Sequence, residues 1–194
     1  MTTGQLFEMV ATDEKALLSA LQDPQQKDQA FKHLVVAHQR MLYQHVRRMV
    51  TDHSDADDVL QNTFLKAWKS IDRFRGDSAL KTWLFRIATN EALTLLNKRK
   101  RQAYSNVEDL QDDARHSHDG GYQPGGEEIQ RHLQAAIATL PEKQRLVFTL
   151  RYFEEMKYDD IAQVLNTSVG GLKANYHHAV KKIELYLSSR VQTT

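Results

Sequence analysis

Apolar side chains recur at helical spacing through the first half of the chain. Between residues 30 and 101 they lie three or four positions apart in successive runs, and no run alternates as a strand would. Gly76 and Asp77 interrupt the pattern. We therefore predict a bundle of helices, with a loop between a helix that ends near Arg73 and one that starts near Ser78.

Hydroxyl and acidic residues mark the start of one of these helices. Ser54 and Asp57 form a capping-box pattern, and Asp55, Asp57 and Asp58 would lie near the positive end of the helix dipole. The same aspartates could form a metal site, but no histidine or glutamate recurs at ligand spacing. We predict a helix N-terminus here and no metal.

The helical pattern disappears between Tyr104 and Glu127. This stretch is rich in Asp, Ser, His and Gly, so it cannot bury enough apolar area to order itself. The charge also changes sign here: residues 80–101 are rich in Lys and Arg and this stretch in Asp and Glu, although the formal net charge of the chain is only +1. We predict a flexible acidic linker between two basic modules.

Helical spacing returns after Glu127 and stops at Pro141, which cannot continue a helix. After a second run, a short helix is predicted around Tyr158 to Leu165. Asn166 is expected to close it in a left-handed conformation, which asparagine tolerates better than most residues.

Ser168 is the expected N-cap of a longer basic helix. The inward face of that helix is predicted to hold Val169, Leu172, Tyr176, Ala179, Val180, Ile183 and Leu187. A short helix, a tight turn and a longer basic helix make the helix-turn-helix arrangement. The predicted fold class is all-α, with two small helical domains joined by the acidic linker.

Composition and motifs argue against an enzyme or a membrane protein. The chain has no cysteine, and it shows no glycine-rich phosphate loop, nucleophile elbow or paired carboxylates in an apolar setting. It shows no signal-peptide pattern and no span-length apolar run. His116, His118 and Asp119 lie in the glycine-rich stretch and are not expected to bind metal. We predict a soluble, cytoplasmic, non-enzymatic protein with no cofactor, no metal, no small-molecule substrate and no membrane insertion.

Polar and basic residues occupy the last helix opposite its apolar face. They are Gly171, Ala174, Asn175, His178 and Lys182, flanked by Gly170, Lys173, His177 and Lys181. Small residues in a first turn let the helix end approach a phosphate, and Asn, His and Lys can meet base edges. The alternative is an ordinary solvated face.

Residues 73–90 mix cations with aromatic rings, as expected where single-stranded bases stack and a phosphate backbone is neutralised. Arg86 and Asn90 lie one turn apart and away from the apolar stripe, so they are the better candidates for DNA contact. Trp83 lies on the apolar stripe, and a core role is at least as well supported for it.

Several segments resemble extracytoplasmic-function sigma factors, which give bacterial RNA polymerase its promoter recognition. Residues 55–68, DADDVLQNTFLKAW, are similar to the polymerase-binding helix of that family, and residues 74–90, FRGDSALKTWLFRIATN, to its promoter-melting segment. LPEKQR, YDDIA and SVGGLK, starting at Leu140, Tyr158 and Ser168, are similar to its fourth-region helix-turn-helix. The matches follow the family order and cover nearly everything from Ala30 to Leu187.

The resemblance implies an N-terminal segment (1–24), a sigma region 2-like domain (25–103), the linker (104–127) and a sigma region 4-like domain (128–190). It implies core RNA polymerase, with its β and β′ subunits, as a partner. Asp57, Asp58, Gln61 and Phe64 would help to dock on the clamp helices of the largest polymerase subunit. The minus-ten promoter element would lie near Lys81, Thr82, Trp83, Arg86 and Asn90. The minus-thirty-five duplex would lie near Ser168, Gly171, Lys173, His177, His178 and Lys181. The family also implies an anti-sigma factor as a partner.

Asn175 and His178 stand where the family commonly has arginine, so phosphate attraction should be weaker here. The residues alone leave two other classes open. A self-sufficient helix-turn-helix repressor or activator with an N-terminal sensory domain would bind DNA tightly by itself, usually as a dimer. An enzyme with a DNA-binding tail would need a catalytic constellation.

Overall fold

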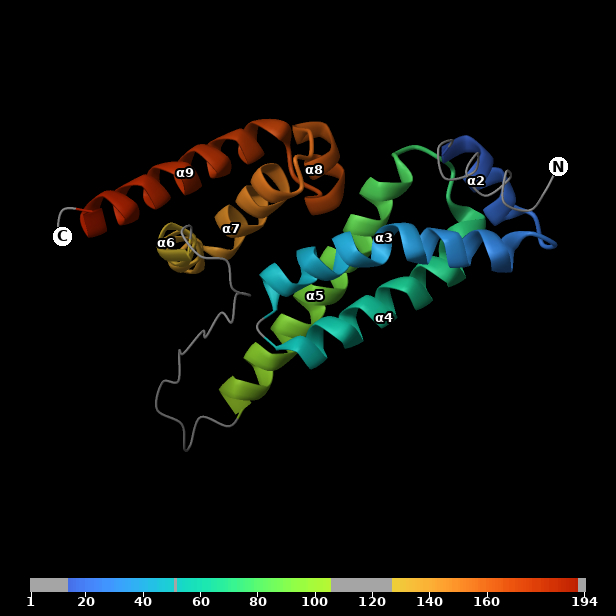
Figure 1. Cartoon of the computed structure of the whole chain (residues 1–194), viewed down its shortest axis with the longest axis horizontal. Helices are drawn as coiled ribbons and strands as arrows, with labels where there is room; N and C mark the ends of the chain where they lie inside the picture. The colour runs from blue at the N-terminus through green and yellow to red at the C-terminus, as the bar shows by residue number, and fades with distance from the viewer. Residues whose placement is uncertain (1–13, 51, 106–126, 192–194) are drawn as a thin grey trace. The chain divides into compact units, whose positions relative to one another are not determined.

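The computed structural model describes residues 14–50, 52–105 and 127–191 of the chain. Regular structure in these ranges is entirely helical (Figure 1), which confirms the predicted all-α class. The chain divides into two compact units, Met1–Tyr104 and Ser105–Thr194. Most of the predicted linker lies outside the described residues. No described helix is long and apolar enough to cross a membrane.

The N-terminal unit is built on α3 (Lys27–Met49), α4 (His53–Ser70) and α5 (Leu80–Ser105). A short 3-10 helix, η1 (Ile71–Arg73), follows α4, and the preceding helix α2 (Glu14–Gln22) packs on α3 and η1 (Figure 1). The apolar faces of these helices meet in a core whose fully buried side chains include Leu21, Leu34, Leu42, Val46, Ile71, Leu84 and Phe85.

The start of α4 differs from the prediction. Asp52 is the N-cap, and its carboxylate accepts hydrogen bonds from the backbone N–H groups of Ser54, at 2.7 Å, and Asp55. The helix therefore begins at His53, and the predicted capping box of Ser54 and Asp57 was wrong. Aspartate and serine are both favoured N-caps, so the sequence pattern did not distinguish between the two starts.

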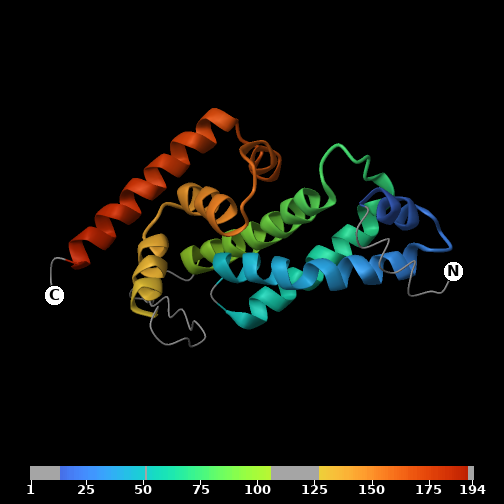
Figure 2. The ribbon, with the colours of Figure 1, turned by 45° about the horizontal axis from the view of Figure 1, so that its top comes forward.

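The C-terminal unit contains α6 (Glu127–Ala138), α7 (Glu142–Phe148), α8 (Tyr158–Leu165) and α9 (Val169–Val191). A π-helix, η2 (Thr149–Phe153), continues α7. α6, α7 and α8 all pack against α9 (Figure 2). Their core cluster is formed by Ala136, Ile137, Leu140, Phe148, Ala179 and Ile183.

The helix-turn-helix is formed by α8 and α9. Asn166 follows α8 with φ 48° and ψ 50°, so the predicted left-handed cap is confirmed. The backbone N–H of Gly171 donates to the Ser168 hydroxyl at 3.3 Å, which confirms Ser168 as the N-cap of α9. The turn between the helices is therefore fixed at both sides by local hydrogen bonds.

Candidate polymerase and nucleic-acid interfaces

The outward face of α4 carries the acidic residues expected to dock on polymerase. Asp57, Asp58 and Gln61 are all exposed. Leu65 follows Gln61 by one helical turn, and 51% of it is exposed, which is unusual for a large apolar residue. The sequence analysis named Phe64 as the apolar docking residue and did not single out Leu65.

Phe64 is only half-buried on α4 and takes part in packing between α4 and α3. Its ring lies edge-on to Phe31, with centroids 6.4 Å apart. Phe31 in turn lies edge-on to Trp68 at 4.9 Å. Phe64 therefore helps to hold two helices together, and only part of its ring can face a partner.

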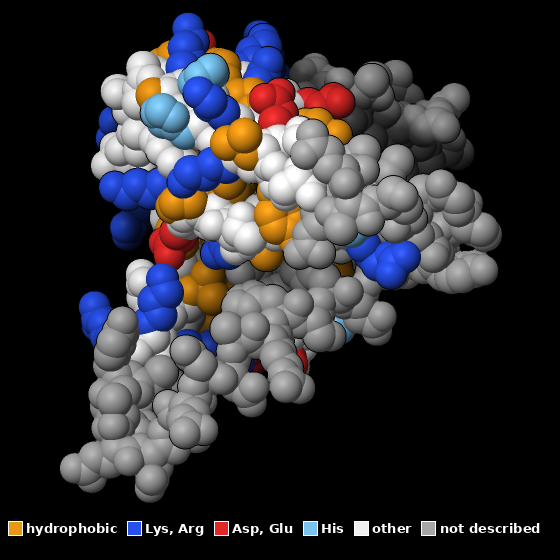
Figure 3. All heavy atoms as spheres, turned by 90° about the vertical axis from the view of Figure 1, so that its left-hand side faces the viewer, with side chains coloured by type: hydrophobic (Ala, Val, Ile, Leu, Met, Phe, Trp, Pro, Cys, Tyr) orange, Lys and Arg blue, Asp and Glu red, His pale blue; other side chains and the backbone are white. Residues whose placement is uncertain are grey.

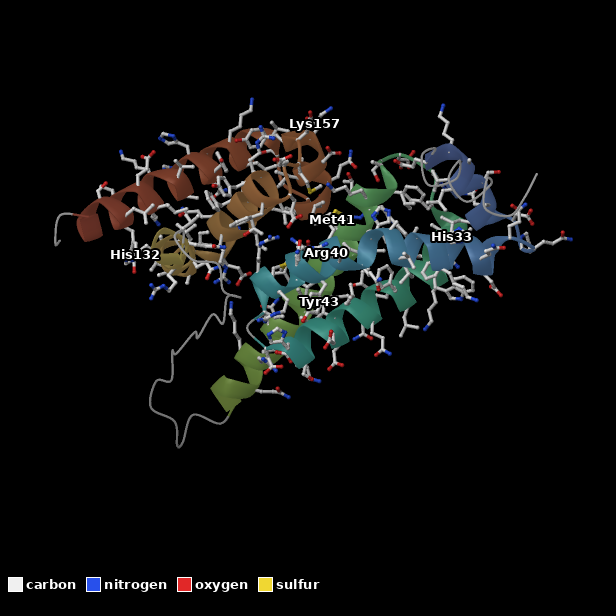
Figure 4. All side chains as sticks on the ribbon, viewed as in Figure 1. His33, Arg40, Met41, Tyr43, His132 and Lys157 are labelled. Carbon is white, nitrogen blue, oxygen red and sulfur yellow. The ribbon has the colours of Figure 1, made fainter. Side chains whose placement is uncertain are left out.

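The junction between α3 and α4 is held by a polar network beside this face. Tyr43, on α3 (Figure 4), shares a hydrogen bond of 2.9 Å between its hydroxyl and Nδ1 of His53. Arg47 donates to the carbonyl of Val50 at 3.1 Å, and its Nη2 lies 3.3 Å from Nε2 of His53. These contacts fix the direction in which α4 leaves the turn.

The residues expected at the minus-ten element fall into two groups on α5. Arg86 and Asn90 are exposed one turn apart, and Lys81 is half-buried with Nζ 5.7 Å from the centre of the Phe85 ring. Thr82 and Trp83 are only 4% and 6% exposed.

The side chain of Trp83 packs against Phe74, with ring centroids 5.0 Å apart. Phe74 begins the segment that leads into α5, and Arg75, Gly76 and Asp77 of that segment are exposed. Gly76 has φ +75°, a conformation that other residues rarely adopt. A buried aromatic pair thus supports an exposed loop with a sharp backbone turn.

Two histidines of α3 have depressed pKa values. The pKa of His45 is lowered to about 3, mainly by burial and also by the nearby charge of Arg48. His45 Nε2 shares a hydrogen bond of 2.9 Å with the hydroxyl of Thr89 on α5. Burial also lowers the pKa of His38, with Glu14 opposing this effect and Lys81 adding to it.

The residues expected at the minus-thirty-five duplex lie at the start and along the outer side of α9. Ser168, Lys173, His177, His178 and Lys181 are exposed, and Gly171 is half-buried. Lysine, arginine and histidine side chains gather over the C-terminal unit in the space-filling view (Figure 3). A Cβ atom on Gly171 would lie 3.3 Å from the Ser168 hydroxyl, so the glycine suits this tight first turn.

Asn175 is engaged within α9. Its side-chain nitrogen donates to the carbonyl of Gly171 at 2.9 Å, and the residue is half-buried. This bond occupies one of its two amide protons. Asn175 therefore has less capacity for a base edge than its sequence position indicated.

Three cations lie near Tyr158 at the start of α8, and the sequence analysis singled out only Lys173 among them. The guanidinium carbon of Arg151 lies 5.2 Å from the centre of the Tyr158 ring, and Lys173 Nζ lies 5.9 Å from it. Lys157, the exposed N-cap residue of α8, is adjacent (Figure 4). The sequence signal that could have identified this basic surface is the pair Arg151 and Lys157, which lie on either side of the turn before α8.

Two family models match the chain in the order of these units. Sigma-70 region 2 matches residues 34–102, and sigma-70 region 4 matches residues 130–183. The helix bundle that carries α4 and α5 is thus a region 2 domain, and the helix-turn-helix unit is a region 4 domain.

Curated relatives define the family more closely. The chain is 33% identical over 186 residues to the ECF RNA polymerase sigma-E factor of Escherichia coli (strain K12), covering 88% of this chain and 92% of the relative. It is 34% identical over 180 residues to the protein of that name in Haemophilus influenzae, covering 88% and 93%. The chain belongs to the extracytoplasmic-function sigma factors of the sigma-70 family. It is a non-enzymatic protein that directs transcription initiation.

Solved structures show the same fold. The sigma factor RpoE of Bartonella quintana, in complex with the anti-sigma factor NepR, has a TM-score of 0.67 and 25% identity, covering 81% of this chain and 96% of that one. CnrH, in complex with the cytosolic domain of CnrY, has the same TM-score and identity, covering 91% and 97%.

Proposed function

We propose that this sigma factor divides promoter recognition among α4, α5 and α9. α9 binds the minus-thirty-five duplex, α4 docks on core polymerase, and α5 holds the separated strand of the minus-ten element. This division rests on one observation: the exposed side chains of α4 differ in chemistry from those of α5 and α9. The α4 stripe offers Asp57, Asp58, Gln61 and Leu65, whereas the outward groups of α5 and α9 are mainly cations, amides and imidazoles.

The α4 stripe suits a polymerase surface that is basic around an apolar patch. Asp57 and Asp58 supply charge complementarity, which speeds association and selects the partner. Leu65 supplies apolar area that water now covers and that a protein partner would bury. Phe64 contributes mainly by keeping α4 in place against α3.

The proposed minus-ten residues form two groups: some would contact the DNA strand, and others would hold the contacting residues in place. Exposed Arg86 and Asn90, with Lys81, would meet the separated strand, while Thr82 and Trp83 would support the helix and loop from inside. Stacking of a base on an aromatic ring contributes on the order of 1 to 3 kcal/mol, so a few captured bases can offset a few unstacked ones. Opening of this kind requires no nucleotide hydrolysis by the sigma factor.

Duplex recognition would use the outer side of α9 with help from the start of α8. Ser168 and Gly171 allow close approach of a phosphate, and Lys173, His177, His178 and Lys181 extend the contact surface. Arg151 and Lys157 enlarge the basic surface around Tyr158. Phosphate contacts position such a helix, and base-edge contacts give it specificity.

An anti-sigma factor would control access to these surfaces. The support is that the solved relatives RpoE and CnrH were each found in complex with a partner, named NepR and the cytosolic domain of CnrY. We place the chain in the cytoplasm, because a sigma factor must meet core polymerase and chromosomal DNA.

A transcription assay with purified core polymerase tests this division. Core enzyme with the chain should give specific transcripts from genomic DNA, and core enzyme alone should not. Variants of α4 should lose polymerase binding, and variants of α9 should lose promoter binding while keeping polymerase. If variants of α4 and α9 lost the same step, the proposed division would be wrong.

A further inference from the structure

Three side chains from α2 and the start of α3 bind the segment that joins α4 to α5. The carboxylate of Glu14 accepts a hydrogen bond from the backbone N–H of Leu80, the first residue of α5. Gln22 Nε2 donates to the carbonyl of Phe74 at 3.0 Å. Lys27 Nζ pairs with Asp72 at 2.6 Å. These contacts join residues 45 to 66 positions apart in the sequence.

The contact at Leu80 is a helix cap supplied by another helix. The first N–H groups of a helix have no partner within it, and a negative charge is favourable at that end. Glu14 meets both needs of α5. α5 is the helix that carries Lys81, Arg86 and Asn90.

The contacts at Phe74 and Leu80 lie at the two ends of an exposed loop. Between them, Arg75, Gly76 and Asp77 are exposed, and Gly76 has φ +75°. The described hydrogen bonds of α2 therefore anchor the loop where it leaves η1 and where it enters α5. α2 itself is held by burial of its apolar side chains Leu17 and Leu21.

The apolar and the polar side chains of α2 thus contact different parts of the domain. Leu17 and Leu21 attach the helix to the domain core, whereas Glu14 and Gln22 bond to backbone groups of one segment. Glu14, Gln22 and Lys27 all precede residue 34, where the match to sigma-70 region 2 begins. The family match therefore assigns them no role.

We propose that α2 is a brace that positions residues 74–81 for capture of the separated strand, with Glu14 and Gln22 as positioning residues. This inference rests on the proposed function of α5. The brace acts by keeping the loop and the first turn of α5 in one arrangement before DNA arrives, which lowers the ordering cost of binding. Loss of the brace should weaken strand capture more than polymerase docking.

The test measures how holoenzyme binds a labelled single-stranded oligonucleotide. The oligonucleotide carries the non-template minus-ten sequence of a promoter selected with wild-type holoenzyme. Glu14→Ala should weaken binding about fivefold, the size expected for loss of one helix cap. Glu14→Gln keeps an acceptor oxygen and should lose about twofold or less. Gln22→Ala should lose about twofold to threefold, as expected for one neutral hydrogen bond.

Two controls separate positioning from general stability. Asp28→Ala removes an exposed carboxylate from the first turn of α3 and should leave oligonucleotide binding unchanged. Affinity of each variant for core polymerase should stay within about twofold of wild type, because Glu14 bonds to α5 and the proposed docking residues lie on α4. Partial rescue by Glu14→Gln relative to Glu14→Ala would support the cap.

The outcomes also separate this inference from the proposed function. If wild-type holoenzyme bound the oligonucleotide and the Glu14→Ala, Gln22→Ala double variant bound it equally well, the brace would be wrong and the proposed function would stand. Equal losses in core affinity and oligonucleotide binding would mean that α2 only stabilises the domain and does not position residues 74–81. Failure of wild-type holoenzyme to bind the strand would overturn both.

Discussion

Arg99, toward the end of α5, forms an ion pair with Asp55 near the start of α4. Arg99 Nη2 donates to Asp55 Oδ1 at 2.5 Å, and Nη1 also lies within ion-pair distance of Oδ2, which accepts no hydrogen bond among the described residues. Asp55 is 8% exposed, whereas half of the Arg99 side chain is exposed. A charge-assisted hydrogen bond of this kind is stronger than one between neutral groups. The pair therefore ties α5, which carries the proposed minus-ten contacts, to α4, which carries the proposed docking residues.

Arg99→Ala should destabilise the N-terminal unit by about 1 to 2 kcal/mol. A buried carboxylate without its partner is costly, but exposure of Arg99 means that water already screens part of the attraction. Urea unfolding can be followed by tryptophan fluorescence, because both tryptophans of the chain, Trp68 and Trp83, lie in this unit. Lys98→Ala, at the exposed neighbour, should change stability little. Equal effects at Lys98 and Arg99 would contradict a specific pair.

Charge reversal at Asp57 and Asp58 should abolish association with core polymerase while the fold is retained. Both residues are exposed near the start of α4, where carboxylates contribute only about 0.3 to 1 kcal/mol to helix stability. Pull-down of core polymerase, with circular dichroism as a check on folding, measures the two effects. Asp28→Lys, an exposed site on α3, is the matched charge control.

Leu65→Ser should weaken polymerase binding about tenfold with little loss of stability. The side chain is mostly in water in the free protein, so its apolar contribution arises only in the complex. Val36→Ser on α3 is the control, since Val36 is 68% exposed and lies outside the α4 stripe. If the Leu65→Ser variant bound core polymerase as well as wild type, Leu65 would not be part of the docking surface.

The local signals of the sequence predicted the helices well. Asn166 ended α8 and Ser168 capped α9 as expected, because both effects act within a few residues. The brace from Glu14 to Leu80 could not be predicted, since it joins groups 66 residues apart and its partner is a backbone N–H. The start of α4 was misplaced because Asp52 and Ser54 are comparable caps.

Candidate sites were predicted as sets, and the sequence separated buried from exposed members only in part: it placed Trp83 on the apolar stripe and Arg86 off it, but it did not set Thr82 apart. Thr82 and Trp83 lie in the same segment as Arg86, yet they are buried and Arg86 is exposed. Phe64 belongs to an aromatic cluster whose other members lie on two helices. Such distinctions depend on packing between helices, which the spacing of residues along one helix does not determine.

Arg86→Ala and Asn90→Ala should reduce promoter opening by more than they reduce closed-complex binding. Their proposed partner is the separated strand, which does not exist in the closed complex. Permanganate footprinting measures opening, and filter binding measures the closed complex. Gln102→Ala, exposed near the end of α5, serves as the control. Equal losses in both measurements would indicate ordinary duplex contacts.

The buried His45 should make the N-terminal unit less stable as the pH falls. Its pKa is lowered from 6.5 to about 3 in the folded protein, so the unfolded chain binds more protons between these values. The free energy of unfolding should therefore fall below pH 6.5, by about 1.4 kcal/mol at pH 5.5 relative to pH 7.5. Above about pH 7.5 this group should have little effect, because histidine is then neutral in both the folded and the unfolded chain.

His45→Gln tests this pH dependence because glutamine can still bond to Thr89 but does not titrate. The variant should be less stable at pH 7.5, since the new side chain cannot reproduce the edge contact of His45 with Phe85. Its stability should change less between pH 7.5 and 5.5 than that of wild type. The same change at His33 on α3 is the control, and an unchanged pH slope in His45→Gln would contradict the argument.

The free protein should bind promoter duplex only weakly, and tight specific binding should require core polymerase. α9 offers Lys173, Lys181 and Lys182 as its cations before residue 190, and a single module that neutralises few phosphates shows poor affinity and a shallow salt slope. Fluorescence anisotropy on a labelled promoter duplex, with and without core enzyme, measures both properties. Lys173→Ala should reduce the salt slope by about 1, and Lys143→Ala, exposed on α7, should not change it. Nanomolar, sequence-specific binding by the free chain would show that α9 needs no help from polymerase, as in a self-sufficient repressor.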